Sequence, residues 1–134
     1  MFFFSKRDDV IDRADVRRGQ PSINHQFGNE AAVAFGVFLY SSALELLTTM
    51  GNLNCIQVIS HAVRVMCDGE LFQLAERGGT TISRETYDRI VYAKTGVLFE
   101  AVFKCSGTVA AVDEVTQQKA AEIGKRLGIL FQVT

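Results

Sequence analysis

The 134-residue chain contains no tryptophan, one proline, two histidines and three cysteines. Because proline is what most strongly interrupts helical hydrogen bonding, its scarcity favours long helices. The cysteines, Cys55, Cys67 and Cys105, lack CxxC spacing, and each lies in an apolar run. We therefore expect reduced thiols in the core rather than a metal or redox site. Reduced thiols in turn favour the cytoplasm.

An excess of charge of one sign is also absent, because 14 basic and 15 acidic side chains leave a net charge of −1. Without a basic surplus we expect no nucleic-acid partner. Met1–Phe4 is too short for the apolar part of a signal peptide. The uncharged run Ala31–Leu44 is shorter than the roughly 20 residues of a membrane-spanning helix, so we expect no transmembrane segment.

The histidines, His25 and His61, have no potential metal ligands at suitable spacing. We expect them to be ordinary loop, surface or core residues. The sequence also contains no legible Ser–His–Asp grouping and no phosphate-binding glycine loop.

Turn residues divide the chain into five helical stretches, which predicts an all-α bundle in one domain, residues 1–134. The expected helices are Phe2–Asp15, Phe27 to about Met50, Asn54–Ala75, a helix from an N-cap at Ser83 to about Ser106, and a last helix capped by Asp113. Loops are expected at Arg18–Asn24 and Arg77–Ile82.

Two of these helices carry further expectations. The helix from Phe27 is apolar almost throughout, so we expect it to be buried on most sides. In the last helix, Gly124 and Gly128 lie one turn apart and would let a neighbouring helix approach closely. Its expected buried stripe consists of Ile123, Leu127, Leu130 and Phe131.

An acidic cluster near the N-terminus is followed closely by a basic pair. Asp8, Asp9 and Asp12 form a DDxxD pattern, and a helix would put Asp8 and Asp12 on one face. Carboxylates with open positions suit Mg²⁺. The guanidinium groups of Arg17 and Arg18 match phosphate oxygens. The pattern indicates metal-bound diphosphate, whereas the acids alone would suit a solvated turn.

Polar residues interrupt two of the apolar helices. Glu70 and Gln73 lie at i, i+3 near the end of Asn54–Ala75, and they either face solvent at the helix end or line a polar cavity. Lys94 has apolar residues three and four positions away on both sides. Its ammonium group therefore either extends to solvent or meets an anion.

Together these motifs resemble the trans-isoprenyl diphosphate synthases, the polyprenyl synthetase family. The run DDVIDRADVRRGQPSIN, residues 8–24, followed by FGNEAAV at Phe27–Val33, is similar to the family's first aspartate-rich region. Further matches follow in order: GELFQL at Gly69–Leu74, KTG at Lys94–Gly96 and LGILFQ at Leu127–Gln132. The resemblance covers nearly the whole chain, and it implies a partial isoprenoid synthase (terpenoid synthase) fold.

The resemblance implies a Mg²⁺-dependent prenyltransferase that condenses an allylic prenyl diphosphate with isopentenyl diphosphate in isoprenoid biosynthesis. Asp8, Asp9 and Asp12 would bind the metal, Arg17, Lys94 and Thr95 the allylic diphosphate, and Arg18 and Gln132 isopentenyl diphosphate, with Glu70 and Gln73 in the cavity wall. Phe3 and Phe4 lie where bulky side chains shorten the product in the family. The interior motifs, in contrast, are more similar to those of long-chain synthases.

The resemblance also implies a truncated central part of the family's domain. The family's upstream isopentenyl diphosphate segment has no counterpart before Met1, and its second DDxxD would follow Thr134. Val37 stands where the family commonly has an acid. The alternative function is therefore a non-catalytic fragment or partner subunit of a polyprenyl diphosphate synthase. Apolar faces without neighbours predict a homodimer or hetero-oligomer.

Overall fold

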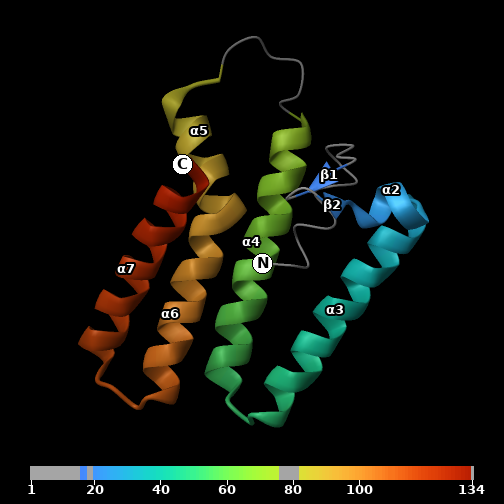
Figure 1. The fold of residues 1–134 in the computed structure, drawn as a ribbon. Helices are drawn as coiled ribbons and strands as arrows, with labels where there is room; N and C mark the ends of the chain where they lie inside the picture. The colour runs from blue at the N-terminus through green and yellow to red at the C-terminus, as the bar shows by residue number, and fades with distance from the viewer. Residues whose placement is uncertain (1–15, 18–19, 76–81, 134) are drawn as a thin grey trace. The chain divides into compact units, whose positions relative to one another are not determined.

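The computed structural model describes residues 16–17, 20–75 and 82–133, and of Arg17 and Gln20 it describes the backbone only. The chain divides into two compact units after Gly51. The described part is helical apart from one short pair of strands (Figure 1). The predicted all-α class is confirmed, whereas the predicted helix Phe2–Asp15 lies outside the described residues.

The first unit begins with two very short strands, β1 (Val16–Arg17) and β2 (Gln20–Pro21), which pair antiparallel. Helix α2 (Ile23–Phe27) follows, and Ser22 caps it by accepting a hydrogen bond from the His25 backbone N–H. The loop predicted to reach Asn24 therefore ends earlier than expected, because the Ser22 hydroxyl starts a helix.

Helix α3 (Asn29–Thr49) confirms the helix expected from Phe27 to about Met50, but the expected burial is wrong. Only Ala32 and Gly36 are buried in it. Its exposed large apolar side chains are Val33, Phe35, Val37, Phe38 and Leu46. A helix that is apolar all round needs neighbours on every side, and the described part of this unit contains only one other helix.

Helix α3 is longer than the uncharged run on which the expectation of no transmembrane segment was based. By length and composition alone, it could cross a membrane. Core helices of soluble proteins meet the same criterion, so the criterion does not separate the two cases.

The second unit contains α4 (Leu53–Ala75), α5 (Arg84–Val91), the π-helical turn η1 (Tyr92–Gly96), α6 (Val97–Val109) and α7 (Glu114–Val133). Helix α6 lies between α4 and α7 (Figure 1). The predicted helix Asn54–Ala75 is confirmed, and so is the Ser83 cap, which accepts from the Thr86 N–H at 3.0 Å. The helix expected after Ser83 is also present, but the sequence pattern did not predict its π turn.

The buried face of α7 consists of small residues, namely Ala121, Gly124 and Gly128. The predicted buried stripe is wrong, since Ile123, Leu127, Leu130 and Phe131 are 44–59% exposed. A Cβ on Gly124 would lie 2.6 Å from the Phe99 carbonyl oxygen, and one on Gly128 would lie 2.9 Å from the Gly96 Cα. The close approach expected at both glycines is therefore confirmed. Backbones this close leave no room for leucine between them.

The cysteines are structural in character, and none of the three forms a disulfide. Cys55 is buried as expected, while Cys67 and Cys105 are half-buried. The Cys105 thiol donates to the Cys55 carbonyl at 3.8 Å. Burial and contact with Cys55 raise the pKa of the Cys105 thiol to about 12, which keeps it neutral and unreactive at ordinary pH.

Asp113 caps α7 as predicted, and its carboxylate accepts hydrogen bonds from the Thr116 N–H at 3.0 Å and the Thr116 hydroxyl at 2.6 Å. These bonds lower the pKa of Asp113 below 3.8. A pKa lowered by folding adds stability above the unfolded-state pKa, and this stability is lost as pH falls through the folded-state value. We expect Asp113→Ala to lower the urea midpoint near neutral pH and to lower it less at about pH 3.

Asp113→Asn is the matched control for this prediction, because asparagine keeps the capping oxygen without an ionisable group. Its loss of stability near neutral pH should be smaller, and it should decrease at about pH 3 in the same way, because both variants lack the carboxyl group that titrates. An alanine variant whose loss is the same at both pH values would contradict the prediction.

Candidate functional site

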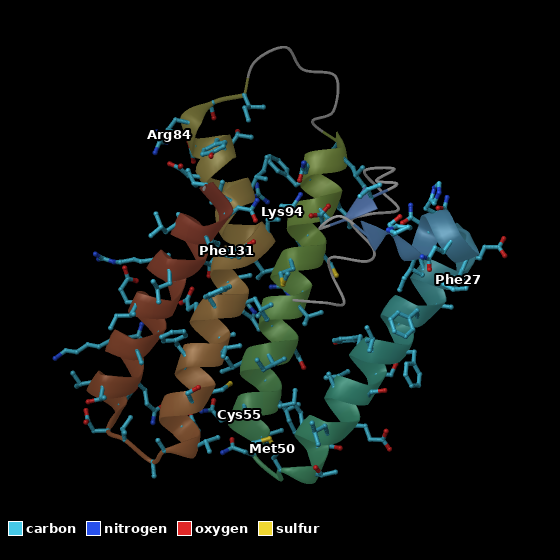
Figure 2. All side chains as sticks on the ribbon, viewed as in Figure 1. Phe27, Met50, Cys55, Arg84, Lys94 and Phe131 are labelled. Carbon is cyan, nitrogen blue, oxygen red and sulfur yellow. The ribbon has the colours of Figure 1, made fainter. Side chains whose placement is uncertain are left out.

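Four of the predicted site residues lie on α4, η1 and α7 of the second unit, where η1 contacts both other helices. Lys94, in η1, is labelled in Figure 2. Glu70 lies near the C-terminal end of α4, Lys94 and Thr95 lie in η1, and Gln132 lies near the end of α7. Residues from three separate helices thus form two side-chain pairs. The sequence could indicate the residues but not this pairing.

The first pair is an ion pair between Glu70 and Lys94. The Lys94 Nζ and Glu70 Oε1 atoms are 3.8 Å apart, and the two side chains are 24% and 11% exposed. Glu70 therefore does not face solvent at a helix end, and Lys94 meets an anion on the neighbouring helix. Charged groups with so little exposure to water need an opposite charge nearby, and Glu70 and Lys94 provide this for each other.

The second pair joins η1 to α7. The hydroxyl of Thr95, a residue only 7% exposed, donates a hydrogen bond to Gln132 Oε1 at 2.5 Å. A glutamine amide has one acceptor end and one donor end. Since Thr95 occupies the acceptor oxygen, the donor end of Gln132 is the part suited to an anionic ligand.

Gln73 contributes an oxygen atom with no hydrogen-bond partner among the described residues. It lies three residues after Glu70, on the same face of α4. Its Oε1 atom is buried, and buried polar atoms in native proteins are nearly always paired with protein, water or a ligand. A cation or a donor group would satisfy this oxygen.

Oxygen ligands of this kind suit Mg²⁺, but a complete metal site needs more of them. In residues 16–17, 20–75 and 82–133, no group of three or more His, Cys, Asp or Glu side chains could hold a metal ion. Glu70 and Gln73 therefore supply oxygen atoms of the type that Mg²⁺ binds, but too few for a metal site by themselves.

The other predicted site residues cannot be placed. Phe3, Phe4, Asp8, Asp9, Asp12 and Arg18 lie outside the described residues. For Arg17 the backbone alone is described, where it pairs with Gln20. The predicted metal ligands and the predicted product-length residues therefore stay predictions.

Tyr92, the first residue of η1, is a feature that the sequence analysis missed. Its hydroxyl donates to Glu100 Oε2 at 2.8 Å, and the Lys125 ammonium lies 5.3 Å from the centre of its ring. Burial, reinforced by the Glu100 carboxylate, raises the pKa of Tyr92 to about 12. Glu100 lies eight positions after Tyr92, so an ordinary helical pattern gave no reason to pair them.

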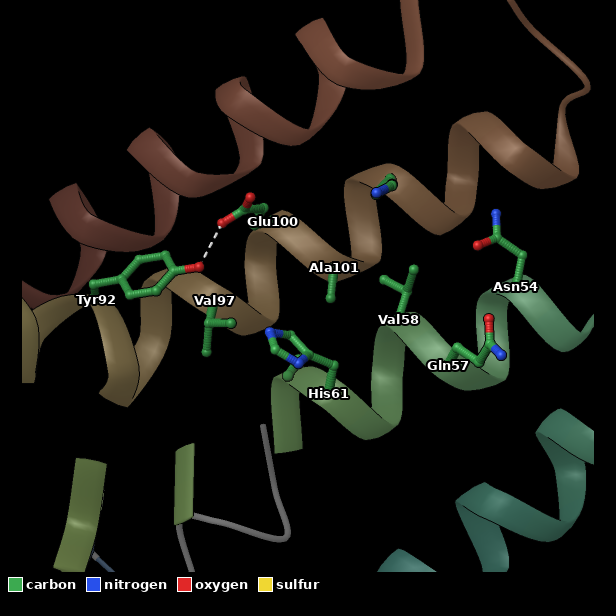
Figure 3. Close-up of a pocket in the computed structure, with 10 residues that line it drawn as sticks. Asn54, Gln57, Val58, His61, Tyr92, Val97, Glu100 and Ala101 are labelled. Atoms are coloured by element: carbon green, nitrogen blue, oxygen red, sulfur yellow. Dashed lines mark hydrogen bonds between the residues drawn. The ribbon is translucent and has the colours of Figure 1, made fainter. Parts of the chain in front are cut away.

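A separate pocket of about 400 Å³ lies between α4 and α6 (Figure 3). Its polar lining comes from Asn54, Gln57, His61, Tyr92, Glu100 and Lys104. His61 and Ala62 precede Glu70 by nine and eight residues, so the pocket lies further along the interface between α4 and the helix formed by η1 and α6. The sequence analysis did not predict it.

Comparison with known proteins supplies further findings. A family model described as Polyprenyl synthetase matches residues 4–134. The octaprenyl diphosphate synthase of Escherichia coli K12 is 40% identical over 126 residues. The match covers 94% of this chain but only 39% of the length of that relative.

Two further similarities concern assembly and structure. Component 2 of the heptaprenyl diphosphate synthase of Geobacillus stearothermophilus is 32% identical, covering 95% of this chain and 40% of that relative. A crystal structure of polyprenyl synthase from Caulobacter crescentus CB15, complexed with calcium and isoprenyl diphosphate, matches with a TM-score of 0.95 and 30% identity. That match covers 98% of this chain and 40% of the other.

The Thr95–Gln132 hydrogen bond gives a prediction about stability. Thr95→Val removes the hydroxyl with little change in shape and leaves the Gln132 oxygen unpaired, so we expect the free energy of unfolding to fall by about 1–3 kcal/mol. Replacing both partners, Thr95→Val with Gln132→Leu, should recover most of this loss, because no polar group is then stranded. Urea denaturation measures both, and an unchanged midpoint in the single variant would contradict the pairing.

Proposed function

The chain belongs to the polyprenyl synthetase family, and on that premise we propose that it carries the diphosphate-binding part of a prenyltransferase of isoprenoid biosynthesis. The observation that carries this proposal is that two adjacent residues of η1, Lys94 and Thr95, pair with Glu70 of α4 and Gln132 of α7. A cation, a hydroxyl and an amide donor are groups that hold phosphate oxygens. The proposed substrates are an allylic prenyl diphosphate and isopentenyl diphosphate.

In this proposal the allylic diphosphate binds through its oxygens to Lys94, Arg17 and Thr95. Lys94 turns from the single carboxylate of Glu70 toward the more highly charged diphosphate. Asp8, Asp9 and Asp12 would hold Mg²⁺, which when bound supplies positive charge to the departing diphosphate. The calcium and isoprenyl diphosphate of the Caulobacter crescentus structure support ligands of these two classes.

The proposed reaction transfers the prenyl group in three bond changes. The allylic C–O bond breaks, and the diphosphate leaves with the electron pair, stabilised by Lys94 and Arg17. The double bond of isopentenyl diphosphate, oriented by Arg18 and the donor end of Gln132, forms the new C–C bond to the allylic cation. The released diphosphate then takes a proton from the carbon next to the new cation, and the C–H electron pair restores a double bond. The product is one isoprene unit longer.

The second candidate is a partner subunit that binds diphosphate without completing the chemistry alone. One specific observation favours it: a relative at 32% identity is itself named as component 2 of a heptaprenyl diphosphate synthase. The two candidates differ in one measurable respect, because both bind diphosphate and only the first forms an extended product.

An activity assay tests the proposal. Incubating the chain with Mg²⁺, labelled isopentenyl diphosphate and an allylic primer should give extended product. Lys94→Met should lower kcat/KM by about 10²–10³, because it removes a donor that stabilises charge on the leaving group. Lys119→Met, which alters an exposed lysine of α7, is the matched control and should leave kcat/KM unchanged.

Binding separates the remaining outcomes of this assay. Replacing Asp8 and Asp12 together with alanine should abolish Mg²⁺-dependent binding of pyrophosphate. Pyrophosphate binding without product formation would favour the partner-subunit candidate. A wild-type chain that neither binds pyrophosphate nor forms product would overturn both candidates.

We also propose that the exposed apolar side chains of α3 mediate self-association into a homodimer. Phe35 and Phe38 stack at 6.5 Å between ring centres, and Phe38 is 63% exposed. A net charge of −1 opposes association of two copies only weakly. Exposed apolar area of this kind is typical of interaction surfaces.

The mass in solution tests the homodimer. We expect light scattering to give twice the chain mass for the wild type and the single-chain mass for Phe38→Glu, because a carboxylate cannot be buried unpaired in an apolar interface. Glu45→Gln, on the same helix, should stay dimeric. A monomeric wild type, or one that sediments only with lipid vesicles, would contradict the proposal.

A further inference from the structure

The helix that carries Lys94 and Thr95 contains a π-helical turn at these two residues. At the end of η1 the Val97 N–H bonds to the Tyr92 carbonyl, five residues earlier rather than four. A π turn adds one residue to a helix and rotates everything beyond it relative to everything before it. Such turns occur often at functional sites.

The Tyr92–Glu100 hydrogen bond depends on this extra residue. In an unbroken α-helix, residues eight positions apart differ by about 80° around the axis, whereas seven positions bring them within about 20°. The π turn absorbs one residue, so Tyr92 and Glu100 come onto one face and their side chains meet at 2.8 Å. This bond is therefore a marker of the π turn.

Two glycines on neighbouring helices leave room for the turn. On α4, a Cβ added to Gly69 would lie 2.4 Å from the Ala93 Cβ. On α7, a Cβ added to Gly128 would lie 2.9 Å from the Gly96 Cα. Both contacts fall on backbone or on the first side-chain atom, which cannot move unless the turn itself moves.

We propose that Gly69 and Gly128 are positioning residues, which hold η1 between α4 and α7 so that Lys94 and Thr95 both reach the diphosphate. Lys94 faces Glu70 on α4, and Thr95, the next residue, bonds to Gln132 on α7. One short turn thus serves two neighbouring helices, and a shift of its backbone away from either helix displaces both side chains. The inference rests on the proposed function for its ligand, while its geometry is independent of that function.

A size swap across the Gly69–Ala93 contact tests the proposal. Gly69→Ala should weaken binding of inorganic pyrophosphate, measured by calorimetry with Mg²⁺, by about tenfold to a hundredfold, the scale of losing one hydrogen bond to a charged group. Gly69→Ala with Ala93→Gly should restore most of the affinity, because the next atom of Ala93 would then lie at an ordinary 3.7 Å.

Gly124→Ala is the matched control for overpacking. Its added Cβ would meet the Phe99 carbonyl and the Phe103 side chain, beyond the π turn. Gly124→Ala should lower the free energy of unfolding, but the folded variant should bind pyrophosphate as tightly as the wild type does. An equal loss of pyrophosphate affinity in Gly69→Ala and Gly124→Ala would overturn the positioning role. Failure of the swap variant to restore the affinity would also overturn it.

Tyr92 provides a readout that needs no ligand. In a Tyr40→Phe, Tyr87→Phe background, tyrosinate absorbance reports Tyr92 alone. Its pKa of about 12 should fall toward 10.0 in Gly69→Ala and rise again in the swap variant, since the burial and the Glu100 bond that raise it depend on the turn. An unchanged pKa in Gly69→Ala would overturn the inference. A wild-type chain that does not bind pyrophosphate, together with a lowered Tyr92 pKa in Gly69→Ala, would instead overturn the proposed function alone.

Discussion

The second unit depends on how closely the backbone of α7 approaches that of α6 and η1. Gly124 and Gly128 make the approach possible, because a Cβ at either position would collide with backbone atoms. Gln132 follows Gly128 by four residues and lies on the same face of α7, so the glycine contact also brings its amide to Thr95. The contact at Gly128 therefore serves both the packing of the bundle and the geometry of the candidate site.

The sequence predicted where helices begin and end better than it predicted which faces they bury. Ser83 and Asp113 were recognisable as caps because their hydrogen bonds are local. The buried side of α7 was predicted wrongly, because apolar spacing favoured its large residues while close packing selected Ala121 and the glycines. The π turn was also missed, since one extra residue in a helix leaves no sequence signal until its neighbours are known.

The candidate site shows the same division between local and tertiary information. From family motifs we predicted that Glu70, Lys94, Thr95 and Gln132 are site residues. From its apolar surroundings, Lys94 was expected either to reach solvent or to meet an anion. The structure adds that this anion is Glu70, which lies on another helix 24 residues earlier. A local sequence pattern could not predict the hydrogen bond from Thr95 to Gln132 either, because the two residues lie 37 positions apart.

The Glu70–Lys94 pair makes its part of the site electrically neutral before any ligand arrives. An incoming anion must then compete for the ammonium group with a carboxylate already 3.8 Å away. Coulombic attraction grows with the charge of the competitor, so a multiply charged group displaces Glu70 more readily than a monoanion does. In the proposed function, the pair would thus favour polyphosphorylated ligands over chloride and simple carboxylates.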